Sequence, residues 1–206
     1  MKPLKEIAIE AAIEGGRQIL TVYGTDDFRV ELKDDDSPLT LADQKAHEAI
    51  MTYLLKTDIP VLSEEGKDIA YAERSGWSRF WLVDPLDGTK EFIKRNGEFT
   101  VNIALVEDGH PVLGVIYVPV VDELYYGTLG EGAYKMLHAS ENFDKDVARG
   151  DVLPLDKGDR PFTIVGSRSH MNEETKAYIT ANSPEGEPYE VISRGSSLKI
   201  CMVAEG

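Results

Sequence analysis

The sequence lacks several features that mark exported or membrane-embedded proteins. Its one cysteine, Cys201, lies in the apolar segment LKICMVA, so no disulfide can form within the chain, and we expect a buried thiol in a reducing compartment. The opening segment, MKPLKEIAIEAAIEGG, carries charge every few residues and has no signal-like apolar stretch. No later run is long enough to cross a bilayer. We therefore expect a soluble, cytoplasmic protein with no integral membrane segment; peripheral association with the inner membrane is left open.

Basic residues are also few and scattered. Lys and Arg number 22 against 37 Asp and Glu, which gives a formal net charge of -15. A surface that binds duplex nucleic acid needs clustered positive charge, so no nucleic-acid polymer is expected as a partner. A small phosphorylated molecule is compatible with this charge if cations within the site reverse the local field, because bound metals are often the largest local charges.

The 42% hydrophobic content is enough for a substantial core, in one large domain or two small ones. Apolar spacing predicts an amphipathic helix over 3–23, ending near Gly24, and a strand at 27–32 follows it. Thr40 is placed to cap a second helix that ends near Lys56. The buried stripe of this second helix is predicted to include Ala42, Ala46, Ala49, Tyr53 and Leu54.

Short apolar runs predict the strands of one sizeable sheet, with Asp108-Gly109 as a hairpin turn. These strands are expected at 59–62, 80–83, 101–105, 112–118, 124–126 and 133–136. A charged segment at 144–160, rich in Gly and Pro, then separates a strand at 162–165 from this sheet, and helices are expected at 172–181 and 196–205. We place a domain boundary near 155, with an N-terminal α+β domain over 1–155 and the start of an α/β domain over 156–206.

The segment WLVDPLDGTKEF, residues 81–92, is the most informative stretch of the chain. Asp84 and Asp87 lie three residues apart in a turn after a buried strand, where their carboxylates can converge. The Leu86 carbonyl between them is a further hard oxygen ligand, and this set suits Mg²⁺. Without a shared cation the two carboxylates would repel each other. The alternative is an ordinary surface turn, in which Asp, Pro and Gly are common for independent reasons.

A second acidic pair, Glu64-Glu65, follows the strand predicted at 59–62. If that strand and the one before Asp84 are neighbours, their ends bring Glu64, Asp84 and Asp87 into one pocket. A solvated loop is the alternative for Glu64-Glu65 alone. The two acidic groups together favour a metal site.

Thr89 and Asp43 can complete such a site. The Thr89 hydroxyl can orient the attacking water if a buried carboxylate accepts its proton, and Asp43 is a suitable acceptor. Alternatively, Asp43 only stabilises the N-terminus of its helix. The amides of Gly88, Thr89 and Lys90 open a short helix, where free N–H groups can bind phosphate oxygens.

These residues resemble the metal-site signature of the inositol monophosphatase-like superfamily. The matching text is DPLDGT at 84–89, Glu64-Glu65 and LADQ at 41–44. Within the superfamily, ELKDDDSPLTLAD and TKEFIKRNGEFTVNIALVEDGHPVLGVIYVP are most similar to the bacterial CysQ-type 3'(2'),5'-bisphosphate nucleotidases. The resemblance extends from about Leu4 to Gly206.

The resemblance implies an α+β fold with the layered αβαβα sugar-phosphatase architecture, in a monomer or homodimer. It also implies a phosphomonoesterase that converts adenosine 3',5'-bisphosphate to AMP and phosphate with two or three Mg²⁺ ions, is inhibited by Li⁺ and serves sulfur assimilation. Metal-activated water would attack directly, without a phosphoenzyme. The implied roles are Glu64, Asp84 and the Leu86 carbonyl at the first metal, Asp84 and Asp87 at the second, and Asp43, Thr89 and Glu64 in catalysis.

Substrate choice is expected to depend on segments 166–170 and 194–199, which resemble the regions that contact the base and the second phosphate in the nucleotidases. His170 can stack on adenine, and Ser196 with Lys199 at a helix start can hold an anion. A solvated loop histidine and a serine that only caps the helix are the alternatives.

One position of the superfamily has no counterpart here. A Trp-Asp motif after the last helix supplies a further ligand to the second metal, whereas the tryptophans of this sequence are Trp77 and Trp81. We therefore expect the C-terminal domain to be truncated and, for a polypeptide that ends at Gly206, weak second-metal binding and poor turnover. The competing functions are an inositol or sugar monophosphatase and a noncatalytic metal- and nucleotide-binding fragment.

Overall fold

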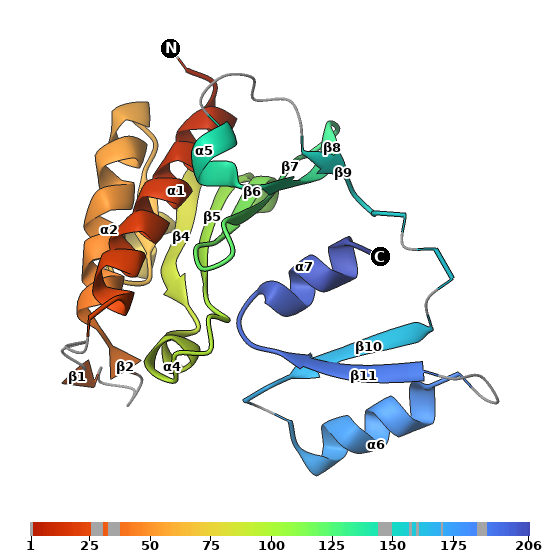
Figure 1. The fold of residues 1–206 in the computed structure, drawn as a ribbon. Helices are drawn as coiled ribbons and strands as arrows, with labels where there is room; N and C mark the ends of the chain where they lie inside the picture. The colour runs from red at the N-terminus through yellow and green to blue at the C-terminus, as the bar shows by residue number, and fades with distance from the viewer. Residues whose placement is uncertain are drawn as a thin grey trace.

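The computed structural model describes residues 2–25, 31–32, 38–143, 150–156, 158–159, 161–169, 171–184 and 189–206. It forms five layers (Figure 1). In order, these are helices α1 (Leu4–Tyr23) and α2 (Leu41–Leu54), a seven-stranded sheet, helix α7 (Leu198–Ala204), a two-stranded sheet and helix α6 (Glu173–Asn182). The predicted α+β fold with αβαβα layers is confirmed. None of the helices in the described ranges combines the length and the apolar content of a membrane-spanning segment.

The two long helices pack closely on one face of the large sheet. Gly15 of α1 lies against Ile50 of α2, so close that a Cβ there would come within 2.9 Å of the isoleucine side chain. Thr40 caps α2, as predicted, with its hydroxyl oxygen accepting from the Ala42 amide at 3.2 Å. A 3-10 turn, η1 (Leu55–Thr57), ends α2.

The predicted buried stripe of α2 was partly wrong. Ile50 is fully buried, whereas Ala49 and Tyr53 are only half-buried. The physical reason is the helical period: the buried hydrophobic residues recur every fourth position, and Ala49 and Tyr53 lie on the flank of that stripe. The described stripe consists of Ala42, Asp43, Ala46, Ile50 and Leu54.

In the large sheet, the strands lie side by side in the order in which they occur in the chain. They are β3 (Val61–Ser63), β4 (Arg79–Asp87), β5 (Thr100–Glu107), β6 (His110–Val118), β7 (Glu123–Thr128), β8 (Gly132–Leu137) and β9 (Asp151–Val152). Among the strands described for this sheet, β3 and β4 pair in parallel and all other neighbours pair antiparallel. The predicted hairpin at Asp108-Gly109 is confirmed, with both residues at positive φ, as a type I′ turn requires.

Short elements occupy the connections. Glu31–Leu32 form β1, which pairs antiparallel with β2 (Pro38–Leu39). The rest of the strand predicted at 27–32 lies outside the described residues. Helices α3 (Tyr71–Arg74) and α5 (Ala139–Asn142) have four residues each, and α4 (Thr89–Ile93) is the short helix predicted after Gly88.

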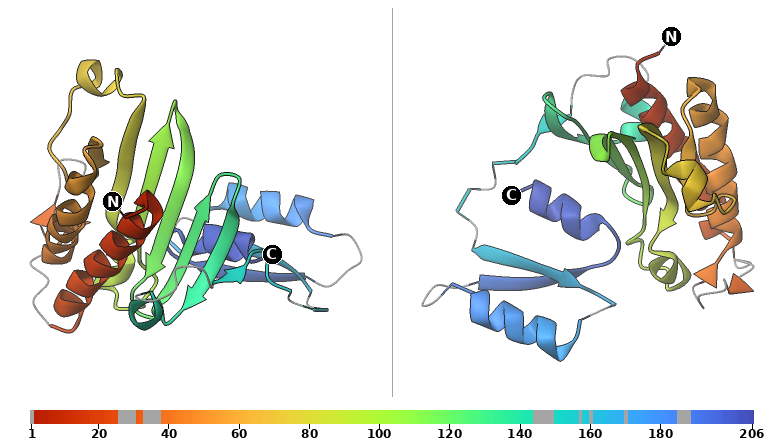
Figure 2. Two further views of the ribbon diagram at one scale, coloured as in Figure 1. Left: turned by 90° about the horizontal axis from the view of Figure 1, so that it is seen from above. Right: turned by 180° about the vertical axis from the view of Figure 1, so that it is seen from behind.

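The C-terminal part of the chain lies on the other side of the large sheet (Figures 1 and 2). Strand β10 (Phe162–Ser167) pairs in parallel with β11 (Tyr189–Arg194), and α6 connects the two. Strand β11 was not predicted, whereas β10, α6 and α7 were. The large sheet ends at Val152 and the small one begins at Phe162, and the domain boundary near 155 stays a prediction.

Helix α7 attaches the C-terminal part to the large sheet. The Glu205 carboxylate, on the residue after α7, accepts hydrogen bonds from Tyr125 Oη and Lys135 Nζ, both at 2.7 Å. Cys201 of α7 is 2% exposed, so the predicted burial of the thiol is confirmed. Burial raises the pKa of this thiol to about 12, so it stays protonated and unreactive at neutral pH.

Candidate active site

Acidic residues from the two predicted clusters meet because β3 and β4 are parallel neighbours. Their register pairs Ser63 with Val83, and the Glu64 amide then donates to the Val83 carbonyl at 3.0 Å. Glu64, which follows β3, and Asp84, which lies in β4, are therefore at the same edge of the sheet. The prediction that these two strands are neighbours is confirmed.

The electrostatics of this edge favour a bound cation. Burial raises the pKa of Asp84 far above its ordinary value, and the carboxyl groups of Glu64 and Asp87 raise it further. The Leu86 amide donates to Asp84 Oδ1 at 3.2 Å, and this hydrogen bond lowers the pKa of Asp84. A buried carboxyl group beside two others ionises at neutral pH only when positive charge is supplied nearby.

The donor set fits a hard divalent cation, because carboxylate and carbonyl oxygens are the ligands that Mg²⁺ prefers. Within the described ranges, no three His, Cys, Asp or Glu side chains form a finished metal-binding group. Binding of an ion would therefore have to draw Glu64, Asp84 and Asp87 closer together. Such an ion would relieve the repulsion of Asp84 by Glu64 and Asp87, which adds to burial in raising the pKa of Asp84.

Asp87 is held by the C-terminal part of the chain. Its Oδ2 accepts hydrogen bonds from Ser196 Oγ at 2.8 Å, from Ser197 N at 2.8 Å and from Ser197 Oγ at 2.6 Å. Asn102 Nδ2 approaches the same oxygen at 3.3 Å. None of these contacts uses Oδ1, so that oxygen is the candidate metal ligand. Asn102 was missed from the sequence, and Ser197 was included only as part of the 194–199 segment, without its contact to Asp87.

Thr89 and Asp43 form the predicted pair. The Thr89 hydroxyl donates to Asp43 Oδ1 at 3.3 Å, while Asp43 Oδ2 accepts from the Thr40 amide at 2.8 Å and from the Thr40 hydroxyl at 2.5 Å. Asp43 therefore supports its helix N-terminus with one oxygen and contacts Thr89 with the other. Burial raises the pKa of Asp43 to about 6, although the hydrogen bonds from Thr40 lower it.

Most of the predicted residues line one pocket of about 420 Å³. Asp84 lies on the wall of an adjoining cavity that shares Glu64 with this pocket, and Asp43 is buried behind Thr89. His170 lies outside the described residues, so its predicted stacking on a base stays a prediction. The predicted residues in the pocket are Glu64, Asp87, Gly88, Thr89, Lys90, Ser196 and Lys199.

Ser196 and Lys199 have partners within the protein. Ser196 Oγ donates to Asp87 and lies 2.8 Å from Thr100 Oγ1, and Lys199 Nζ donates to the Ser196 carbonyl at 2.6 Å. The alternative that Ser196 only caps a helix is wrong, because α7 begins after Ser197 and has no side-chain cap. Anion binding by Ser196 and Lys199 stays a prediction.

Comparison with known proteins matches all of residues 1–206 to the inositol monophosphatase family. The 3'(2'),5'-bisphosphate nucleotidase CysQ of Salmonella typhimurium is 47% identical over 98% of this chain and 76% of its own length. The CysQ of Escherichia coli K12 is 46% identical over 96% of this chain and 75% of its own length.

Solved structures also include proteins that are similar to this chain in fold and sequence. A crystal structure of CysQ from Bacteroides thetaiotaomicron, described as a bacterial member of the inositol monophosphatase family, superposes with a TM-score of 0.86 at 51% identity, covering 97% of this chain and 75% of its own. The extragenic suppressor protein suhB of Bartonella henselae superposes with a TM-score of 0.73 at 28% identity, covering 97% of this chain and 73% of its own.

Proposed function

Because this chain belongs to the inositol monophosphatase family, we propose that it is a metal-dependent phosphomonoesterase that hydrolyses adenosine 3',5'-bisphosphate to AMP and phosphate. Identities of 46% to 47% to CysQ nucleotidases over nearly the whole chain support this substrate class. One pocket supports the proposal most directly, because it is lined by Glu64 after β3, by Asp87 at the end of β4, by Thr89 in front of the buried Asp43, and by residues of the 195–199 segment.

The proposed cofactor is Mg²⁺, bound as two or three ions. Glu64, Asp84 and the Leu86 carbonyl would hold the first ion, and Asp84 with Asp87 Oδ1 the second. When bound, the ions supply a nucleophile at neutral pH and neutralise the charge that develops on the leaving oxygen. Glu64 and Asp87 both raise the pKa of the buried Asp84, and this unfavourable crowding of negative charge supports the assignment.

The protein's own contribution to proton transfer is the Thr89–Asp43 pair. The Thr89 hydroxyl lies 3.3 Å from Asp43 Oδ1 and 3.4 Å from the Leu86 carbonyl. When it donates its proton to Asp43, its oxygen can accept a hydrogen bond from an attacking water in the pocket that Thr89 lines. Glu64, at the same pocket, would orient this water from the other side. The raised pKa of Asp43 makes it a stronger base than an ordinary carboxylate, and this favours transfer of the proton through Thr89.

The substrate would lie along the pocket with its scissile phosphate near Gly88, Thr89 and Lys90. The Lys90 and Lys199 side chains place positive charge at this pocket, although the net charge of the whole chain is -15. Stacking of His170 on the base and binding of the second phosphate by Ser196 and Lys199 are part of the proposal. So are a cytoplasmic location and a monomeric or homodimeric state; nothing in the described residues supports the peripheral membrane association.

A phosphate-release panel tests this function. Adenosine 3',5'-bisphosphate and inositol 1-phosphate are compared at equal concentration with Mg²⁺, with EDTA, and with Mg²⁺ plus Li⁺. We expect faster release from the nucleotide, abolished by EDTA and inhibited by Li⁺. Equal or faster release from inositol 1-phosphate would instead identify an inositol monophosphatase. Nucleotide binding by calorimetry without phosphate release would identify a noncatalytic binding protein.

A further inference from the structure

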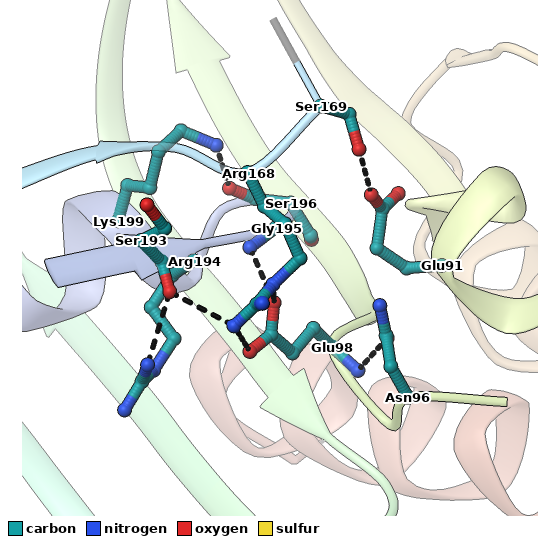
Figure 3. A network of polar contacts seen from close by, with 10 residues as sticks. All are labelled: Glu91, Asn96, Glu98, Arg168, Ser169, Ser193, Arg194, Gly195, Ser196 and Lys199. Carbon is teal, nitrogen blue, oxygen red and sulfur yellow. Dashed lines mark hydrogen bonds and ion pairs between the residues drawn. The ribbon is translucent and has the colours of Figure 1, made fainter. Parts of the chain in front are cut away.

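An ion pair beside the pocket joins two segments that are far apart in the sequence (Figure 3). Arg168, just after β10, donates from Nε to Glu98 Oε2 at 2.6 Å and from Nη2 to Glu98 Oε1 at 2.7 Å. Glu98 lies in the loop between α4 and β5. This two-pronged geometry fixes orientation as well as distance, because the guanidinium plane must align with the carboxylate.

The same two side chains also hold the loop that follows β11. Glu98 Oε2 accepts from the Gly195 amide at 2.8 Å, and Arg168 Nη2 donates to the Ser193 carbonyl at 3.0 Å (Figure 3). The Arg168 amide donates to the Arg194 carbonyl at 3.0 Å. Glu98 and Arg168 therefore fix the start of the 195–197 loop from both sides.

The 195–197 loop also packs closely against α4 and the Glu98 backbone. A Cβ added to Gly195 would lie 2.6 Å from Glu91 Cγ and 3.1 Å from the Glu98 carbonyl oxygen. A Cβ added to Gly88 would lie 3.1 Å from the same carbonyl and 3.2 Å from Ser196 Cβ. Glycine at both positions lets the loop approach α4 and the Glu98 backbone.

The loop leads directly to Asp87. The two residues that follow Gly195 donate the three hydrogen bonds that Asp87 Oδ2 receives from Ser196 and Ser197. We propose that Arg168 and Glu98 are positioning residues: they fix the 195–197 loop so that it orients Asp87 and leaves Oδ1 free for a divalent cation. This inference rests on the proposed function only in assigning Asp87 to the metal.

The charge state of Glu98 is consistent with this role. Burial alone would raise its pKa, but the hydrogen bonds from Arg168 and the Gly195 amide lower the pKa below its ordinary value. The carboxylate is thus ionised and accepting at neutral pH.

The test compares Arg168→Gln with Arg79→Gln and Arg168→Lys. Arg79 is a matched control, because it pairs with Glu107 at 2.7 Å, its side chain is 45% exposed against 42% for Arg168, and it lies at the end of β4 opposite Asp87. Binding of Mn²⁺ is measured by calorimetry without substrate, the Mg²⁺ dependence by phosphate release, and thermal unfolding in EDTA.

Loss of groups that orient metal ligands typically weakens metal binding by about 10- to 100-fold. Because Arg168 acts through a loop, we expect Arg168→Gln to weaken metal binding by only about three- to tenfold. The effect should be about the same for Mn²⁺ binding and for activation by Mg²⁺. Arg79→Gln should change neither constant, and Arg168→Lys should recover part of the affinity. Unchanged Mn²⁺ affinity in Arg168→Gln would overturn the proposal, whether or not KM for the nucleotide or the unfolding temperature changes. So would a wild-type chain that binds no Mn²⁺, whereas Mn²⁺ binding without phosphate release would contradict only the proposed function.

Discussion

Substitution of Asp43 by Asn should separate the functional role of this residue from its role as a helix cap. Asp43 is 1% exposed, and burial raises its pKa from 3.8 to about 6, against the hydrogen bonds from Thr40. The difference of about 2 pKa units, at about 1.4 kcal/mol per unit, means that ionised Asp43 costs the folded protein about 3 kcal/mol at neutral pH. Asparagine avoids this cost and loses about 1 kcal/mol for each weakened hydrogen bond to Thr40.

Asp43→Asn should therefore be at least as stable as the wild type at pH 7.5, while kcat falls by about 100- to 10,000-fold because Thr89 loses its proton acceptor. Thermal unfolding in EDTA and phosphate release measure the two effects. The stability difference also has a pH signature. Because the folded-state pKa of Asp43 lies above the unfolded value, wild-type stability relative to the variant is highest below about pH 4 and falls as the pH rises through about 6.

Thr40→Ala is the control: it removes the capping hydroxyl, including its hydrogen bond to Asp43 Oδ2, but leaves the Thr89 contact with Asp43 Oδ1 in place. It should cost about 1 kcal/mol of stability and reduce kcat far less than Asp43→Asn does, because Asp43 remains a carboxyl group in contact with Thr89. Near-normal turnover in Asp43→Asn, or a loss of several kcal/mol at every pH, would refute the reasoning and leave Asp43 as a helix cap alone.

Three further changes test other parts of the site and fold. Asp84→Asn should lower phosphate release by more than about 1,000-fold without lowering the unfolding temperature in EDTA, since it removes the charge proposed to be shared by two ions. Turnover of this variant at the wild-type rate would argue against Asp84 as a metal ligand. Gly195→Ala should reduce turnover because its Cβ would lie 2.6 Å from Glu91 Cγ, whereas Gly114→Ala, with no atom within 4 Å of its Cβ, should not; equal kinetics would contradict the tight loop. Lys135→Met should lower the free energy of unfolding by about 3 kcal/mol in urea denaturation, because it removes the Lys135 ammonium from the buried Glu205 carboxylate, and no change would show that the other partners of Glu205, Tyr125 among them, suffice.

The sequence predicted those parts of the fold that depend on neighbours in the chain. Thr40 with Asp43 three residues later specifies the start of α2, and Asp108-Gly109 has the residue types that a type I′ turn requires, so both were found. Strand β11 was missed because its apolar run, Val191-Ile192, is short and lies between Glu190 and Ser193, whereas β10 begins with the longer run at 162–165.

The candidate site divides in the same way. DPLDGT and Glu64-Glu65 stand directly after apolar runs, so their meeting could be predicted from the sequence once two strands were taken as neighbours. The contacts of Arg168 with Glu98 and of Ser197 with Asp87 join residues 70 and 110 positions apart. No spacing rule connects such residues, since their contact follows from how the C-terminal part packs on the large sheet.

Carboxylates from separate strands are proposed to gather around divalent cations. The most direct measurement is anomalous scattering from a crystal grown with Mn²⁺ as a substitute for Mg²⁺. We predict peaks at the edge of β3 and β4, within about 2.0–2.3 Å of oxygens of Glu64, Asp84 and Asp87. A well-ordered map in which these three side chains point away from one another, with manganese absent from this edge, would contradict the account.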